Sequence, residues 1–215
     1  MTFSIVARDP VTGALGLATA TAGPLVGALV PHVRKGLGAV ATQAMTNPYL
    51  ALDMLDVLET QSAADAMDAA LSADPERELR QAIVVDRSGQ AAGWTGSACE
   101  PYAAHIVADG VAAAGNMLAD DGVLVAMLSA FDAPGDAGLS QKLLAALRAG
   151  AAQGGDKRGV GSAALKVCGA EAYPELDLRI DWSATPIADL ERLFEMATTG
   201  SYADFFATVK RRQIT

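Results

Sequence analysis

The residues with the clearest chemical potential stand at the very start of the chain. A strand-like alternation begins at Thr2 and places its hydroxyl and that of Ser4 on one face of a strand, opposite the apolar side chains Phe3, Ile5 and Ala7. If Met1 is removed, Thr2 combines a hydroxyl nucleophile with a free α-amine, whose ordinary pKa of about 8 suits a base at neutral pH. The same alternation is typical of an ordinary half-buried strand, so the pattern alone leaves both interpretations open.

Two amide side chains are candidates to support such chemistry. Gln43 stands near the end of an apolar run, residues 37–44, ahead of a helix start, where an amide and nearby backbone N–H groups can stabilise an oxyanion. Asn116 follows Gly115 at the end of another strand-like run and is a second candidate for oxyanion stabilisation or orientation. Either residue can equally be a hydrogen-bonded end of a sheet.

A polar loop, residues 154–159, carries the remaining charged candidates. Lys157 and Arg158 can clamp a carboxylate on the substrate, or they can simply be solvated, as most charged loop residues are. The loop sequence GGDKRG lacks both the Lys-Ser/Thr ending and the preceding strand of a phosphate-binding loop, which argues against nucleotide binding.

The histidines and cysteines do not form a recognisable metal or catalytic pattern. His32 and His105 have no Cys, Asp or Glu at metal-ligand spacing, so we expect no metal and no other cofactor. Cys99 lies six residues before His105, a weak spacing for a catalytic pair, and a buried free thiol is the simpler interpretation.

Composition and charge limit the class of protein. The 215 residues are 51% hydrophobic but only 5% aromatic, which indicates a core of Ala, Leu and Val in one domain. A formal net charge of −9 disfavours nucleic acid and anionic membrane surfaces as partners. The longest apolar run, residues 23–31, contains prolines and is too short to span a bilayer. The two isolated cysteines and the lack of a signal segment indicate a cytoplasmic protein.

The elements that must position these residues alternate between strands and pairs of helices. The patterns predict strands near residues 2–8, 14–21, 37–44, 81–86, 90–95, 102–107, 111–116, 162–168 and 176–181. They predict helices that begin near Asn47, Ser62, Asp120, Leu139 and Thr185, and a short amphipathic helix from Ser201. The four strands between residues 81 and 116 are expected to form a second sheet or half-sheet.

This order fits neither strict β-α-β alternation nor an all-β sandwich. Paired helices between antiparallel hairpins predict an α+β, four-layer αββα sandwich, in which two mostly antiparallel sheets lie between helical layers. We expect residues 1–200 to form a single domain and residues 201–215 to form a C-terminal helical tail that packs on a second copy of the chain.

The predicted architecture resembles that of the N-terminal nucleophile (Ntn) hydrolases, the superfamily of proteasome β subunits and several amidases. Several local sequence segments resemble those of the bacterial domain-of-unknown-function family 1028, which is described as belonging to that superfamily. The matching segments are MTFSIVARDP at the start, GLGAVATQAMTNP from Gly36, CEPYAAH from Cys99, AAAGNML ending at Leu118, GGDKRGVGSAAL from Gly154 and YPELDLRID from Tyr173. They cover nearly the whole chain.

The resemblance implies a role for several residues. Thr2 matches the position of the superfamily nucleophile, and Ser4 would be a supporting hydroxyl or, as a second choice, the nucleophile itself. Asp156 lies in a region similar to the one that supports the terminal threonine of proteasome subunits, where an acid holds an ammonium or orients a water; a loop acid that caps a turn is the alternative.

The expected function is therefore an amidohydrolase that cleaves a small C–N bond, with a small molecule as substrate and a homo-oligomer as the assembly. A catalytically silent αββα protein that binds a small ligand, or that serves as a scaffold, remains the competing hypothesis, because fold does not imply function.

Overall fold

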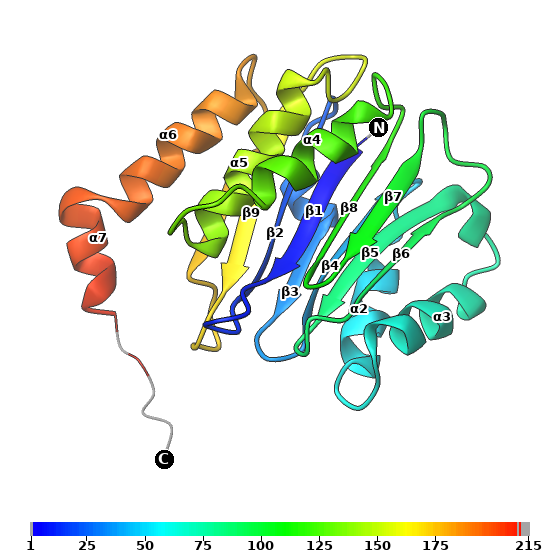
Figure 1. Ribbon diagram of the computed structural model, residues 1–215, viewed down its shortest axis with the longest axis horizontal. Helices are drawn as coiled ribbons and strands as arrows, with labels where there is room; N and C mark the ends of the chain where they lie inside the picture. Colours follow the sequence, from blue (N-terminus) through cyan, green and yellow to red (C-terminus); the bar gives the residue numbers. More distant parts are fainter. Residues whose placement is uncertain (1, 210, 212–215) are drawn as a thin grey trace.

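The computed structural model describes residues 2–209 and 211, and Figure 1 shows two β-sheets stacked between layers of helices. Within these residues, one sheet has six strands in the order β10-β9-β2-β1-β8-β7, and the other has four in the order β3-β4-β5-β6. All paired strands in both sheets run antiparallel. The four-layer αββα sandwich predicted from the sequence is confirmed.

The larger sheet contains β1 at its centre and carries the start of the chain. Its strands are β1 (Thr2–Arg8), β2 (Leu15–Thr21), β7 (Ala104–Ala108), β8 (Val111–Asn116), β9 (Ser162–Cys168) and β10 (Leu176–Ile180). The strands of the smaller sheet are β3 (Pro31–Arg34), β4 (Gly38–Ala44), β5 (Arg80–Asp86) and β6 (Ala91–Thr95).

Helices cover the outer face of each sheet (Figure 1). The larger sheet packs against α4 (Gly122–Phe131), α5 (Leu139–Ala152) and α6 (Pro186–Thr198), and the smaller sheet against α2 (Pro48–Val57) and α3 (Ala63–Ala73). The short elements are α1 (Val26–Leu29), the 3₁₀ helix η1 (Arg77–Leu79) and α7 (Gly200–Ala207). A third apolar cluster fills the space between the two sheets, so the molecule has three buried layers.

Strand β1 separates two of these layers, and its alternation follows the sequence pattern. Phe3 and Ile5 are fully buried among the residues beneath α4 and α5. Val6 belongs to the cluster between the sheets, and Ser4 contacts β4 of the opposite sheet. The face that carries Thr2 and Ser4 therefore points into the space between the sheets.

Glycine at position 150 lets α5 approach β1 closely. A Cβ atom there would lie 2.7 Å from Cγ of Met127 and 3.3 Å from Cδ2 of Phe3, both too close for an unshifted packing. Helix α5 therefore packs directly against β1, the strand that carries Thr2. This packing holds the start of the chain in place.

Two of the predicted helix starts, at Asn47 and Ser62, are capped by side chains that satisfy free N–H groups, whereas the side chain of Thr185 makes no such bond at the start of α6. The Asn47 side chain accepts from the N–H of Tyr49, and Pro48 begins α2 at a position that needs no donor. Ser62 and Asp65 form a reciprocal capping box at the start of α3.

Two predictions about the strands were wrong. The segment between β2 and β4 contains α1 and β3, neither of which the sequence pattern predicted, because Pro24 and Pro31 break its apolar run. The four strands β5 to β8, which end at Asn116, do not form a sheet of their own. β5 and β6 extend the sheet of β4, whereas β7 and β8 join β1 in the larger sheet. The four-residue strand β3 is too short to show a clear alternation.

The C-terminal helix α7 is present, and Tyr202, Phe205 and Phe206 on it are exposed. Residues 210 and 212–215 of the expected tail lie outside the described residues, and the division into residues 1–200 and 201–215 stays a prediction. In the part of the chain that the structure describes, no helix has both the length and the apolar character needed to span a membrane.

Candidate active site

Thr2 begins the central strand β1 and lies between two polar neighbours. It faces Thr21 of β2 on one side and Asn116 of β8 on the other. Its side-chain hydroxyl donates to Oγ1 of Thr21 at 3.2 Å, and only 7% of the residue is exposed. The nucleophile candidate is therefore flanked by hydrogen-bonding side chains on both neighbouring strands.

Ser4 lies deeper on the same face and links the two sheets. Its hydroxyl is 2.6 Å from Oε1 of Gln43 and 2.7 Å from Oγ1 of Thr19. Because Oε1 of an amide only accepts, the Ser4 hydrogen points to Gln43 and the Thr19 hydroxyl donates in return. The single proton of Ser4 is already engaged, which suits a supporting hydroxyl better than a nucleophile.

Gln43 reaches across from β4 and holds the backbone of Thr2. Its Nε2 donates to the carbonyl oxygen of Thr2 at 3.3 Å and to Oε1 of Gln81 at 2.8 Å. These two bonds use both hydrogens of the amide nitrogen, and the Oε1 atom is taken by Ser4. This geometry orients Thr2 and leaves the Gln43 side chain no hydrogen for an oxyanion, so the geometry favours an orienting role for Gln43 over oxyanion stabilisation.

Gln81 on β5 is the centre of the network, although no local sequence pattern marks it as a site residue. Its Oε1 accepts from Gln43 and from Nδ2 of Asn116, at 2.8 and 3.0 Å. Its Nε2 lies within hydrogen-bond distance of Oγ1 of Thr95 and of the carbonyl oxygens of Ala104 and Gly115. The available signal was one fully buried polar residue at the start of the apolar strand RQAIVVD.

The network reaches the surface at His105. Gln81 donates to Oγ1 of Thr95, and this oxygen lies 2.9 Å from Nδ1 of His105, close enough for a hydrogen bond between the two side chains. Burial lowers the pKa of His105, which favours the neutral imidazole. Thr95, Cys99 and His105 line a surface pocket of about 450 Å³. Gly93 makes room for the imidazole, because a Cβ atom there would lie 2.5 Å from its Cδ2.

Asp156 lies across the start of β1. Its Oδ2 accepts from the N–H of Ala22, just past Thr21, and its backbone pairs with Leu118, just past Asn116. Because Thr21 and Asn116 flank Thr2 in register, the loop that carries Asp156 spans the beginning of β1 from one side to the other. The carboxylate is fully buried.

Arg158 belongs to the same loop and forms an ion pair with Asp156. Its Nη2 lies 3.3 Å from Oδ2, and its backbone N–H donates to Oδ1 of Asp156 at 2.8 Å. The arginine side chain is 47% exposed, so part of the guanidinium remains accessible to a solute. Ser162, in register with Thr21, donates to the carbonyl oxygen of Gly23 and accepts from the N–H of Val26, and so secures the loop after β2.

Unusual backbone conformations occur directly after two of the site residues. The non-glycine residues with positive φ in the described part of the chain are Leu25, Ala44 and Met117, with φ of 64°, 68° and 48°. Ala44 directly follows Gln43 and Met117 directly follows Asn116. Such conformations are costly for residues with a Cβ atom and persist where the surrounding structure enforces them, often at functional sites.

The structure brings most of the predicted site residues together. Thr2, Ser4, Gln43 and Asn116 belong to one hydrogen-bonded group, and Asp156 with its partner Arg158 lies beyond the start of β1. Met1, whose removal the terminal-amine chemistry requires, lies outside the described residues. In the described residues, no group of three or more His, Cys, Asp or Glu side chains is arranged to hold a metal ion.

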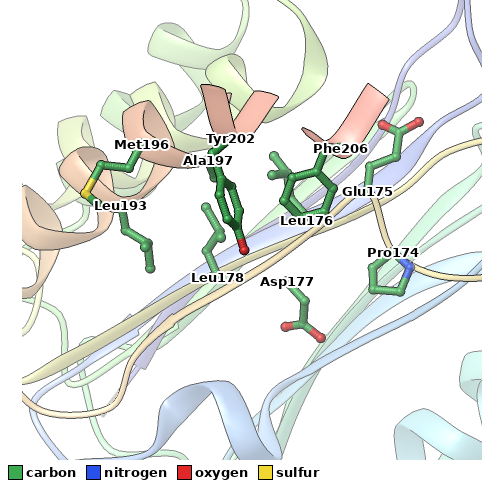
Figure 2. Close-up of a pocket in the computed structure, with 10 residues that line it drawn as sticks. All are labelled: Pro174, Glu175, Leu176, Asp177, Leu178, Leu193, Met196, Ala197, Tyr202 and Phe206. Atoms are coloured by element: carbon green, nitrogen blue, oxygen red, sulfur yellow. The ribbon is translucent and has the colours of Figure 1, made fainter. Parts of the chain in front are cut away.

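An apolar pocket of about 500 Å³ lies elsewhere in the molecule, between β10, α6 and α7. Figure 2 shows Tyr202 and Phe206 of α7 pointing toward Leu176 and Leu178 of β10. This pocket shares no lining residue with the network around Thr2, so it is a separate feature of the fold.

Comparison with known proteins gives a family but no activity. The model of a family of unknown function, DUF1028, matches residues 2–190. The crystal structure of protein SPO2555 from Silicibacter pomeroyi, described with the same family model, is similar with a TM-score of 0.90 and 38% identity over 97% of this chain and 91% of that chain. Anbu (ancestral beta-subunit) from Yersinia bercovieri matches with a TM-score of 0.46 and 10% identity over 99% of this chain and 100% of that chain. No curated protein matches the chain.

Proposed function

This chain belongs to DUF1028, a family of unknown function, and we propose that it is an Ntn-type amidohydrolase that cleaves a small amide C–N bond with Thr2 as its N-terminal nucleophile. The observation that carries the proposal is the position of Thr2. It begins the central strand, its hydroxyl points into the space between the sheets, and the loop that carries the buried Asp156 spans the start of its strand.

The chemistry requires that Met1 be removed, which the small side chain of Thr2 permits. The new α-amine then takes the proton of the Thr2 hydroxyl, whose oxygen attacks the amide carbon. Collapse of the tetrahedral intermediate breaks the C–N bond, and the ammonium returns its proton to the leaving amine. Water, deprotonated by the same amine, hydrolyses the ester and restores Thr2, so that amide and water give carboxylic acid and amine.

The surrounding residues have separate tasks in this proposal. The carboxylate of Asp156 stabilises the terminal ammonium and orients the attacking water. Gln43 and Asn116 orient the strand end, because Gln43 holds the Thr2 carbonyl and both amides meet at Gln81. Ser4 supports Gln43 through its engaged hydroxyl. The exposed part of the Arg158 guanidinium is placed to bind a carboxylate on the substrate.

Intact-mass spectrometry of protein from its native host, followed by an amide panel, tests this function. We expect a mass that corresponds to a chain beginning at Thr2 and turnover of at least one amide, ureide or lactam. Thr2→Ala should abolish turnover while leaving the fold intact, and Thr2→Ser should retain part of it, because a hydroxyl and an amine are both preserved. Met1 on essentially every molecule of an active preparation would refute the terminal-amine mechanism.

A second candidate function is binding without catalysis, or a scaffold role. It is favoured by the closure of the network, in which the side-chain hydrogens of Ser4, Gln43 and Gln81 are all engaged by protein acceptors and the three residues are at most 1% exposed. The same panel of compounds tests this alternative. If a compound raises the melting temperature and the Met-processed protein turns over none of them, the binding function replaces the amidohydrolase function.

We also propose that the chain assembles with copies of itself. The rings of Tyr202, Phe205 and Phe206 on α7 lie 5.1–6.0 Å apart from one another and are all exposed. Burial of such an aromatic surface is favourable, which a second copy would provide. Size-exclusion chromatography with light scattering should give a mass above that of the 22.0 kDa chain, and a monomer at micromolar concentration would rule this out.

A further inference from the structure

A third pocket lies at the opposite end of β1 from Thr2. It has a volume of about 680 Å³ and is formed by the turns after β1, β5 and β7 together with the loop between α4 and α5. Arg8, the last residue of β1, lines it. At about 3.3 Å per residue, the length of the strand separates this pocket from Thr2 by roughly 20 Å. It is therefore independent of the candidate active site.

Arg8 has no partner for its charge in the described part of the chain. Its Nε atom is buried and makes no hydrogen bond, and the guanidinium takes part in no ion pair. The side chain runs past two turn glycines: a Cβ atom on Gly89 would lie 3.9 Å from its Cδ, and one on Gly13 would lie 3.8 Å from its Nη2. Because Nε has almost no solvent-accessible surface, a solute in the pocket would meet the terminal nitrogens of the guanidinium, for which the described residues likewise provide no hydrogen bond or ion pair.

Lys142 is the second cation of this pocket. Its ammonium makes no ion pair and no hydrogen bond among the described residues, although its charge acts on the nearby carboxylate of Asp9. Its ammonium lies 5.7 Å above the ring of Phe131, a contact that leaves its hydrogens available. The nearby carboxylate of Asp9 is committed to its own turn, where it accepts from the N–H groups of Val11 and Thr12 at 2.8 and 3.0 Å.

Three further carboxylates line the pocket without hydrogen-bond or ion-pair partners in the described chain. They belong to Asp109 in the β7–β8 turn and to Asp132 and Asp136 between α4 and α5. Groups of both charges thus share one pocket, yet they do not pair with one another. This separation leaves room for a solute that carries both charges.

We propose that this pocket binds a zwitterionic ligand of the amino-acid or short-peptide type. Arg8 and Lys142 take its carboxylate, and the aspartates take its ammonium. A dianion would be repelled by the aspartates, and a simple cation would leave Arg8 unsatisfied. The volume lies within the usual range of small-molecule sites and accommodates a short peptide.

Isothermal titration calorimetry with L-alanyl-L-alanine tests the proposal. Two capped derivatives each remove one charge: the N-acetyl form lacks the ammonium, and the C-terminal amide lacks the carboxylate. We expect saturable binding of the free dipeptide and binding of each capped form weakened by about tenfold or more. The Thr2→Ala protein should bind equally well, which separates this site from the proposed catalytic one and prevents hydrolysis during the titration.

Matched variants locate the binding. Arg8→Gln and Lys142→Gln should weaken the free dipeptide, whereas Arg148→Gln, at an exposed arginine on the other half of α5, should have no effect. If Arg8→Gln fails to fold, Asp132→Asn with Asp136→Asn serves instead, because both residues lie in an exposed loop. This double variant should weaken the free dipeptide and leave the N-acetyl form unchanged.

Several results would overturn the proposal. These are no saturable binding of the dipeptide, equal affinity for all three compounds, or tighter binding of inorganic phosphate than of the dipeptide. The last result would make the pocket a plain anion site.

Discussion

Replacement of Gln81 by leucine tests whether the buried network around Thr2 is held together at one residue. The substitution keeps the approximate volume of the side chain but removes the acceptor used by Gln43 and Asn116, which are only 1% and 2% exposed. It also removes the donor for Thr95, whose position near the surface allows water to compensate.

The magnitude follows from the number of buried donors left without an acceptor. Each costs about 1–3 kcal/mol, and Gln81→Leu creates two of them. We therefore expect the free energy of unfolding to fall by about 3 kcal/mol, after allowance for water at the Thr95 side and for the apolar surface that leucine adds. Gln90→Leu, which removes an exposed amide beside the next strand, is the matched control and should change stability by less than about 0.5 kcal/mol.

Urea denaturation followed by circular dichroism measures both variants, with an unchanged slope as the sign that the native and unfolded states are comparable. Gln43→Leu and the double variant Gln43→Leu/Gln81→Leu complete a cycle. Because the double variant removes donor and acceptor together, its loss should be smaller than the sum of the single losses by about 1 kcal/mol or more. A loss for Gln81→Leu no greater than that of the Gln90 control, or strict additivity in the cycle, would refute the argument.

Three further predictions concern stability and reactivity. The side-chain hydrogen bond from Arg80 holds the pKa of Asp74 below its ordinary value, so the stability that this contact provides is present above about pH 4 and is lost as the pH falls further. Asp74→Asn should therefore lower the urea midpoint at pH 7, which corresponds to a loss of about 2 kcal/mol in the free energy of unfolding. The difference between this variant and the wild type should shrink at pH 3. Gly16→Ala should destabilise the protein because the new Cβ would lie 2.9 Å from a backbone carbonyl oxygen, whereas Gly23→Ala meets nothing within 4 Å and should be nearly neutral in the same assay. Burial raises the pKa of the thiol of Cys168, a residue that is 5% exposed. We therefore expect iodoacetamide at pH 7 to alkylate Cys168 more slowly in the folded protein than in an unfolded control, as measured by mass spectrometry. Equal rates would contradict the burial of this thiol.

The sequence by itself determined the layered fold and most of its elements. The alternation of Thr2 and Ser4 with Phe3 and Ile5 fixed which face of the first strand enters the space between the sheets, because successive side chains of a strand point to opposite faces. Cap residues such as Asn47 located helix starts for an equally local reason, since they bind the N–H groups of their own helix.

The sequence also nominated residues that the fold brings together, although their partners are distant in the chain. Gln43 and Asn116 were chosen because each stands at a strand end, and their bonds to Ser4 and Gln81 follow from the stacking of the two sheets. Their catalytic or orienting roles stay predictions, as do those of Thr2, Asp156 and Arg158.

Only the tertiary structure decided how the strands are divided between the sheets and which residue is the centre of the network. Hairpin signals show that β5 pairs with β6 and β7 with β8, but they contain nothing about which sheet each pair joins, because that choice depends on packing between segments far apart in the chain. The role of Gln81 could not be predicted for the same reason, because a single glutamine in an apolar strand has no partner nearby in the sequence. Its hydrogen-bond partners come from β4, β6, β7 and β8, which meet at Gln81 only in the folded chain.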